Sequence, residues 1–251
     1  MKRVTRVTST AFATASLVMA LGVTLPATGG ASSSPALDNP LGLASSGAHV
    51  WVANTAGNSV SEFNASNGSL TRTVSLAADD LNSPIALGVN RSNVWIANKA
   101  GNSLTELNAT SGSLERVVEG ASYGFSDPIG LAFSGPNLWV SDASGDGLSE
   151  INAATGSLVR TVSSPRDKFA APWNLIVKGP HLWVVNANGD SVTELNSISG
   201  TLVKVLSGHT YGFDNPIALA VVGPTIWIAN GAGNSITVVS SSTGAFLRYL
   251  P

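Results

Sequence analysis

The chain has 251 residues, of which 43% are apolar and 11% are charged, and its formal net charge is −2. The apolar content suffices for a sizeable core in one or two domains, and the mild acidity argues against an electrostatic nucleic-acid surface. With no cysteine, the chain has no disulfide, thiolate metal site or catalytic thiol.

The first 31 residues are predicted to be a secretory signal peptide. Residues 1–10 carry three basic side chains, residues 11–25 are apolar and uncharged, and small residues follow, with cleavage expected after Ala27 or Ala31. The apolar run is short for a membrane span, and no later segment resembles one. Residues 32–39 are expected to form a linker. The mature chain is therefore expected to be secreted, extracellular or associated with the cell envelope.

Self-similarity is the strongest signal in the rest of the sequence. Five tryptophans recur every 44 residues, and five prolines show the same spacing without an insertion or deletion. The tryptophans are Trp51, Trp95, Trp139, Trp183 and Trp227, and the prolines are Pro40, Pro84, Pro128, Pro172 and Pro216. The chain therefore contains five repeats, each beginning at one of these prolines.

Each repeat contains four short apolar or alternating runs separated by Gly, Asn, Ser and Pro. In the second repeat these runs are Ile85–Val89, Asn93–Ala97, Ser103–Leu107 and Leu114–Val118. Four strands in about 40–50 residues are typical of one β-propeller blade, with strands a to d in chain order. The sequence therefore predicts an all-β propeller of five four-stranded blades over residues 40–251. Each repeated Trp would fill the wedge between two blades.

The amino-acid sequence of the repeat resembles those of the YVTN and NHL-type propeller families. The resemblance rests on Val50-Trp51-Val52-Ala53-Asn54 and Gly57-Asn58-Ser59-Val60-Ser61-Glu62, and it extends over about residues 40–251. It implies the fold and leaves the activity open, because these families include ligand-binding, scaffolding and enzymatic members. Such propellers often have six to eight blades. The five repeats therefore form either a ring closed by side-chain packing or an incomplete ring completed by another chain.

An acidic and a basic position recur ten residues apart, across the hairpin between strands c and d. The acidic residues are Glu62, Glu106, Glu150 and Glu194, and the basic residues are Arg72, Arg116, Arg160, Lys204 and Arg248. This spacing predicts exposed cross-strand pairs, each contributing at most ~1 kcal/mol. The fifth repeat has Val238 at the acidic position, so Arg248 should lack a partner there. An unpaired Arg248 either has no functional role or marks an interface with another chain.

Candidate ligand-binding residues lie in the d-to-a loops and at the start of strand a. Two loops carry the sequence Tyr-Gly-Phe, with Tyr123 and Phe125 in one and Tyr211 and Phe213 in the other. Aromatic side chains there could stack on a sugar or peptide, or fold back as a lid over the core. In the fourth repeat, Trp173 and Asn174 replace the apolar and small residues found in the other repeats. This irregularity marks a pocket wall or repacking without a function.

The b-to-c turns are rich in Asn and Asp, which suit tight turns and left-handed backbone. Asp142 and Asp146 form the most metal-like pair, but they lack the ligand spacing of an EF-hand loop. They are therefore weak metal candidates, and no cofactor is expected.

Catalytic signatures are sparse. His49 and His181 are expected in a-to-b turns, and His209 lies in a d-to-a loop near Asp214. His209 and Asp214 are the weak catalytic candidates, because no paired His motif or nucleophile elbow accompanies them.

The function predicted is a secreted binding module for a protein, peptide or glycan, with its site on the face formed by the d-to-a and b-to-c loops. Streptogramin lyases share a similar propeller, so the enzymatic alternative is a metal-assisted lyase or hydrolase. A third hypothesis is a structural envelope protein. The mature chain is expected to have no nucleic-acid partner and no membrane span.

Overall fold

The computed structural model describes residues 37–251, apart from 78–79 and 91. The predicted signal peptide and residues 32–36 of the predicted linker lie outside the described residues. The rest forms five antiparallel sheets, and each sheet contains four strands that are consecutive in the chain. The predicted β-propeller architecture of five four-stranded blades is confirmed.

The blades are numbered one to five in chain order. Blade one contains β1 (Pro40–Ser46), β2 (His49–Asn54), β3 (Ser59–Asn64) and β4 (Leu70–Ser75). Blade two contains β5 (Pro84–Asn90), β6 (Asn93–Asn98), β7 (Ser103–Asn108) and β8 (Leu114–Val118). Blade three contains β9 (Pro128–Ser134), β10 (Asn137–Asp142), β11 (Gly147–Asn152) and β12 (Leu158–Val162). Blade four contains β13 (Pro172–Lys178), β14 (His181–Asn186), β15 (Ser191–Asn196) and β16 (Leu202–Ser207). Blade five contains β17 (Pro216–Val222), β18 (Thr225–Asn230), β19 (Ser235–Ser240) and β20 (Phe246–Leu250).

Two single-turn 3₁₀ helices, η1 (Ala121–Tyr123) and η2 (Ala187–Gly189), interrupt the loops of the described chain. None of its helices is long and apolar enough to cross a membrane.

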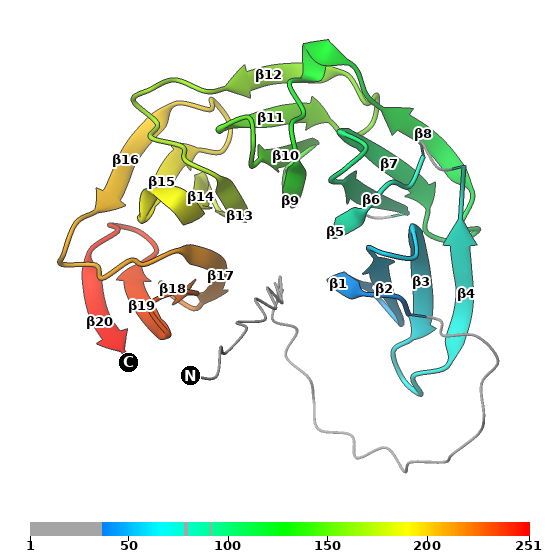
Figure 1. The fold of residues 1–251 in the computed structure, drawn as a ribbon, viewed down its shortest axis with the longest axis horizontal. Helices are drawn as coiled ribbons and strands as arrows, with labels where there is room; N and C mark the ends of the chain where they lie inside the picture. The colour runs from blue at the N-terminus through cyan, green and yellow to red at the C-terminus, as the bar shows by residue number, and fades with distance from the viewer. Residues whose placement is uncertain (1–36, 78–79, 91) are drawn as a thin grey trace, which may run out of the picture.

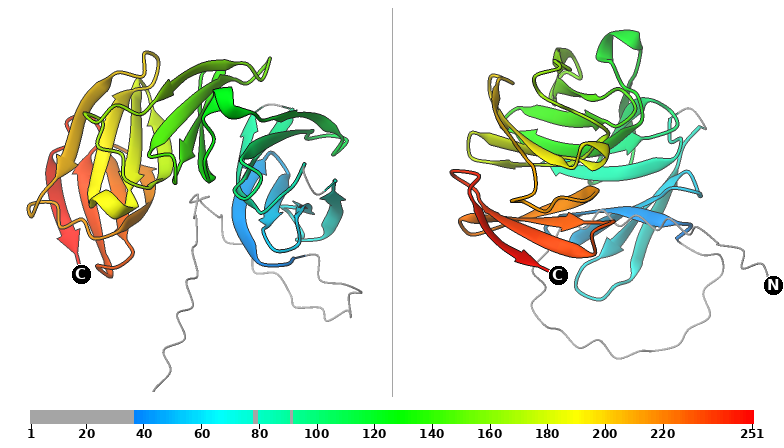
Figure 2. Two further views of the ribbon diagram at one scale, coloured as in Figure 1. Left: turned by 45° about the horizontal axis from the view of Figure 1, so that its top comes forward. Right: turned by 60° about the vertical axis from the view of Figure 1, so that its left-hand side comes forward.

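The blades stand side by side around a common centre, with the first strand of each blade innermost (Figure 1). Inner strands of successive blades contact one another from β1 through β5, β9 and β13 to β17. Among the described residues, no comparable contact joins β17 to β1. The array is therefore an open arc, and a gap separates blade five from blade one in Figure 1 and in the left view of Figure 2.

Every blade begins with the same backbone geometry. The residue before each repeated proline is left-handed, with φ between 49° and 56°. These residues are Asn39, Ser83, Asp127, Ala171 and Asn215. Proline then starts the inner strand at a place where the missing N–H costs no ladder bond. The chain consequently enters all five blades in one register.

The core consists of four apolar clusters, and each fills the seam between two neighbouring blades. In the first seam, Trp51 of blade one packs with Leu87 and Val94 of blade two. Trp95, Trp139 and Trp183 occupy the equivalent places in the next three seams. All four indoles are completely buried, whereas Trp227 of blade five is half-buried. The predicted wedge therefore exists at four of the five tryptophans.

Small residues on the inner strands allow neighbouring blades to approach closely. A Cβ added at Gly42 would lie 2.5 Å from the carbonyl oxygen of Ile85 in the next blade. A Cβ at Gly130 would lie 2.6 Å from Leu175 Cδ2. The crowding near the axis explains why these positions carry no side chain.

The acid–base pairs are not exposed, contrary to the prediction. Glu106 is paired across the strands with Arg116, as predicted, but its carboxylate is completely buried. The other three glutamates are buried in the same way. Burial raises the pKa of Glu106 above its usual range, and the charge of Arg116 opposes that rise. The basic side chains remain partly exposed, and each covers its buried glutamate at the seam.

Candidate functional site

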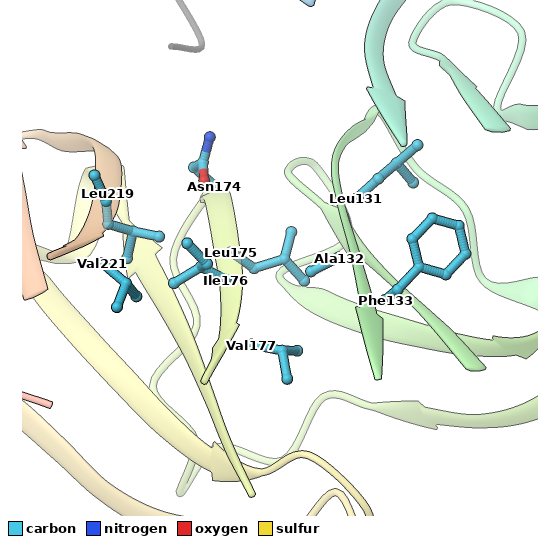
Figure 3. Close-up of a pocket in the computed structure, with 10 residues that line it drawn as sticks. Leu131, Ala132, Phe133, Asn174, Leu175, Ile176, Val177, Leu219 and Val221 are labelled. Atoms are coloured by element: carbon cyan, nitrogen blue, oxygen red, sulfur yellow. The ribbon is translucent and has the colours of Figure 1, made fainter. Parts of the chain in front are cut away.

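A cavity of about 330 Å³ lies on the inner strands of blades three, four and five (Figure 3). Its walls are formed by Leu131, Ala132 and Phe133 of β9, Asn174, Leu175, Ile176 and Val177 of β13, and Leu219, Ala220 and Val221 of β17. Nine of these ten residues are apolar. Inner strands position them because side chains alternate between the two faces of each blade, and the inner strand is the edge of the blade nearest the open centre.

Asn174 is the polar exception in this wall. The equivalent positions in the other blades are Gly42, Ala86, Gly130 and Ala218. Its side chain is half-buried and forms no hydrogen bond within the described chain. The amide points away from the apolar side chains in Figure 3, and it also borders a smaller cavity of about 40 Å³ near the axis. Asn174 therefore offers a free donor and acceptor beside an apolar surface.

Trp173 precedes Asn174 and joins two seams. Its half-buried ring packs against the cluster between blades two and three and against the cluster between blades four and five. Its carbonyl oxygen accepts a hydrogen bond of 3.0 Å from Ser141 Oγ in blade three. The irregular start of β13 thus makes blade four different from the others on the inner surface.

The loop aromatics pack within the seams. Tyr123 stacks on Phe125 at 5.4 Å, and its hydroxyl donates to Gly156 O at 3.0 Å. Tyr211 stacks on Phe213 at 5.3 Å, and its hydroxyl donates to Gly244 O at 3.2 Å. Phe213 is buried, and the other three rings are half-buried. These contacts hold the loops against the core.

Asp142 and Asp146 take separate roles in the structure. Asp142 is 2% exposed, and Ser149 Oγ donates to its Oδ2 at 2.9 Å. Burial raises the pKa of Asp142 to about 8. Asp146 is exposed, and its Oδ1 accepts a hydrogen bond of 2.8 Å from the backbone N–H of Ala171. The pair therefore does not converge on one point.

The weak catalytic candidates, His209 and Asp214, are both exposed. Their side chains are not hydrogen-bonded to one another, and His209 has no ion pair within the described residues. His49 and His181 begin strands β2 and β14, which corrects their placement in turns. They bond Glu62 and Glu194, respectively, because each lies two residues before the Trp that the strand register sets opposite that glutamate. No group of three acidic or His side chains suited to a metal occurs in the described part of the chain.

The repeat pattern of the sequence indicates Asn174 as a candidate but does not indicate the apolar wall around it. Phe133, Leu219 and Val221 were not candidates, because apolar residues on a strand are usually assigned to the core. The signal that could have found them is the apolar pair three and five residues after four of the five repeated prolines, since only the first repeat has a polar residue, Ser45, in this pair. These positions lie on innermost strands and border the centre.

No family model matches the chain, and no curated protein matches it. Among solved structures, a streptogramin B lyase is similar with a TM-score of 0.73 and 19% identity, over 85% of this chain and 69% of that chain. The computationally designed Ika8 protein is similar with a TM-score of 0.66 and 20% identity, over 84% of this chain. The chain spans 61% of the length of Ika8. At these identities the likeness shows the β-propeller fold alone.

Proposed function

We propose that the protein is a secreted binding module whose ligand sits against the inner strands of blades three to five. The observation that carries this proposal is the free amide of Asn174 beside the apolar cavity. A hollow lined by apolar side chains, with backbone polar groups and one side-chain amide that can fix orientation, is the usual design of a small-ligand site. The ligand class that fits is amphipathic, with an apolar body and a group that pairs with an amide.

The ligand is proposed to enter from the face of the d-to-a and b-to-c loops. Asn174 lies two residues after Pro172, where the d-to-a loop enters β13, whereas Val177 lies near the a-to-b turn. A ligand entering from the loop face would therefore meet the amide first and the apolar wall next. Trp173 precedes Asn174 on β13 and is proposed as a second contact.

The test compares ligand binding by the native chain and by Asn174→Ala. Alanine is the residue of blades two and five at this position, so the variant should fold normally. A panel of amphipathic glycosides, peptides and small molecules, screened by ligand-observed NMR, should bind the variant roughly three- to tenfold more weakly than the native chain. Asn67→Ala, in an exposed turn, is the matched control.

A second variant narrows the cavity without touching the amide. Ala220→Leu adds volume to the wall and should weaken the same ligands. Binding that survives both Asn174→Ala and Ala220→Leu would place the site elsewhere. Export is proposed from the N-terminal sequence alone, and fractionation of cells and medium would test it.

A further inference from the structure

Three contacts recur in every seam of the arc. The first joins the basic residue of strand d to backbone carbonyls in the c-to-d turn of the next blade. Arg72 Nη2 donates to Thr110 O at 2.8 Å, and Arg116 Nη2 donates to Ala154 O at 3.0 Å. Arg160 donates to the carbonyls of Ser199 and Ile198, and Lys204 Nζ donates to Thr243 O at 2.6 Å.

The second contact covers the glycine of that same turn. A Cβ added at Gly112 would lie 3.0 Å from Arg72 Cδ. A Cβ at Gly200 would lie 3.2 Å from Trp139 Cη2. The basic residue and the indole of one blade therefore close over the turn of the next.

The third contact links the b-to-c turn to the left-handed residue before the next proline. The side-chain Oδ1 of a left-handed Asn or Asp accepts the backbone N–H of that residue. The four bonds are Asn58 to Ser83 at 2.8 Å, Asn102 to Asp127 at 2.9 Å, Asp146 to Ala171 at 2.8 Å and Asp190 to Asn215 at 2.7 Å. These bonds set the order and register of the blades.

Blade five presents one half of each contact without the other half. Trp227 is half-buried, and Arg248 lies 5.1 Å over its ring instead of reaching a turn. Asn234 has the left-handed φ of its counterparts, at 46°, but its Oδ1 accepts no N–H within the described residues. Ala229, Ile236 and Leu250 share this face and are half-buried, whereas Ala53 and Val60 at the same places in blade one are completely buried.

Blade one presents the complementary halves. Leu43 is 48% exposed, whereas Leu87 is 9% exposed and Leu175 and Leu219 are 5% exposed. A Cβ added at Gly68 would meet nothing within 4 Å. Asn39 has the left-handed φ of 52° that precedes each proline, and no Asn or Asp side chain of the described chain accepts its N–H.

We propose that these two end faces form a docking surface for a separate polypeptide built of the same kind of blade. The two faces do not meet each other, because the four packed seams set a curvature that leaves a gap (Figure 1). In both similar propellers the matched arc takes up more than half of the chain, so the part left to complete such a ring is smaller than a second copy of this arc. The propellers similar to this chain continue well beyond the matched arc, which covers 69% and 61% of them.

The seams specify the chemistry of this partner. Toward blade five it carries a glycine turn with free carbonyls for Arg248, and a left-handed residue before proline whose N–H bonds Asn234. Arg248 is free to reach these carbonyls, because Val238 stands opposite it where the other basic residues have a glutamate. Toward blade one it carries a tryptophan and a basic residue that cover Gly68 and Leu43.

The first experiment joins the probe to the chain. The probe is an 88-residue unit with the sequence of residues 163–250, which spans two blades and their entry loops, appended directly after Leu250. Hydrogen exchange in β18 and β20 should slow by roughly tenfold, because the added blade covers Trp227 and the strands beside it. Arg248→Glu should remove that gain. Unchanged exchange in the extended chain would show that the face does not accept a blade.

Leu247→Ser is the matched control. Leu247 is 50% exposed on the same strand, yet Val159 and Val203 at the equivalent positions remain 41% and 48% exposed beside an occupied seam. Its replacement should therefore leave the protection intact.

The second experiment supplies the same unit as a separate tagged chain, co-expressed with the protein. A 1:1 complex should copurify, remain with Leu247→Ser and be lost with Arg248→Glu or Asn234→Ala. Protection in the extended chain without such a complex would show that the surface joins blades of one chain only. Trp227 already protected in a dilute native monomer, or a native chain that self-associates through Trp227, would also overturn the proposal.

Discussion

Blade three differs from the other blades in the residue at the end of strand b. Four blades carry an Asn there, and its Nδ2 donates to two hydroxyl groups of strand c, as Asn186 does to Ser191 and Thr193. Blade three has Asp142, and Gly147 removes one of the two hydroxyls. Of the two hydroxyl groups, only that of Ser149 remains to bond the carboxyl, whose Oδ1 is buried without a side-chain partner. A group so placed is more stable when it is protonated.

Asp142→Asn should remove a pH dependence of stability. Because burial raises the pKa of Asp142 to about 8, the folded chain holds this proton between pH 4 and 8 while the unfolded chain loses it. The free energy of unfolding should therefore fall as pH rises through that range and become constant above about pH 8. The loss is on the order of a few kcal/mol, and urea unfolding of both chains from pH 4 to 9 measures it.

The reverse substitution, Asn186→Asp, is the control in blade four. It should introduce the same downward slope, because Asn186 is equally buried. Parallel stability profiles for the native chain and Asp142→Asn would contradict the assignment.

At the scale of the secondary-structure element, the strand d basic residue stabilises a seam only where the next blade is present. Arg116 pairs with the buried Glu106 and bonds the turn of blade three. Arg248 occupies the same strand position but meets only Trp227 of its own blade. The two arginines therefore provide a matched pair of substitutions.

Arg116→Ala should destabilise the fold by about 3 kcal/mol, because it leaves the carboxylate of Glu106 buried without a charge partner. Arg248→Ala should cost less than about 1 kcal/mol, since Val238 leaves no buried charge behind. Guanidinium unfolding of the two variants measures the difference. Equal losses would contradict a role for the seam in this stabilisation.

The strands, their order and the seam tryptophans could be predicted from the sequence, because the 44-residue spacing repeats a local pattern of apolar runs and turns. The burial of Glu62 could not, because the turn and basic residue that cover it depend on contacts across a seam. The curvature of the arc could not be predicted either, since it is set by side-chain packing between blades. For the candidate site, Asn174 was visible as a break in the repeat, but the cavity beside it depends on three strands from three blades.

At the scale of the whole molecule, the open arc makes the five blades unequal. Blade three contacts neighbours on both sides, whereas blades one and five each contact one neighbour. In an array stabilised by nearest-neighbour contacts, the end units open most easily.

Hydrogen exchange by mass spectrometry should therefore show the slowest exchange in blade three and faster exchange in β2 and β18, although the three blades share one strand pattern. The expected order follows from the number of occupied seams and not from local sequence. Uniform protection of the inner strands in all five blades would indicate a closed ring in solution.

The unbroken spacing of the repeats also bears on how such a chain can change its length. Each blade meets the next through the same three contacts, and no repeat between Pro40 and Trp227 is longer or shorter than another. A gene segment encoding 44 residues could consequently be duplicated or deleted with every side chain kept on its proper side of the sheet. The number of blades can then differ among related proteins, while the contacts in the seams between blades stay unchanged.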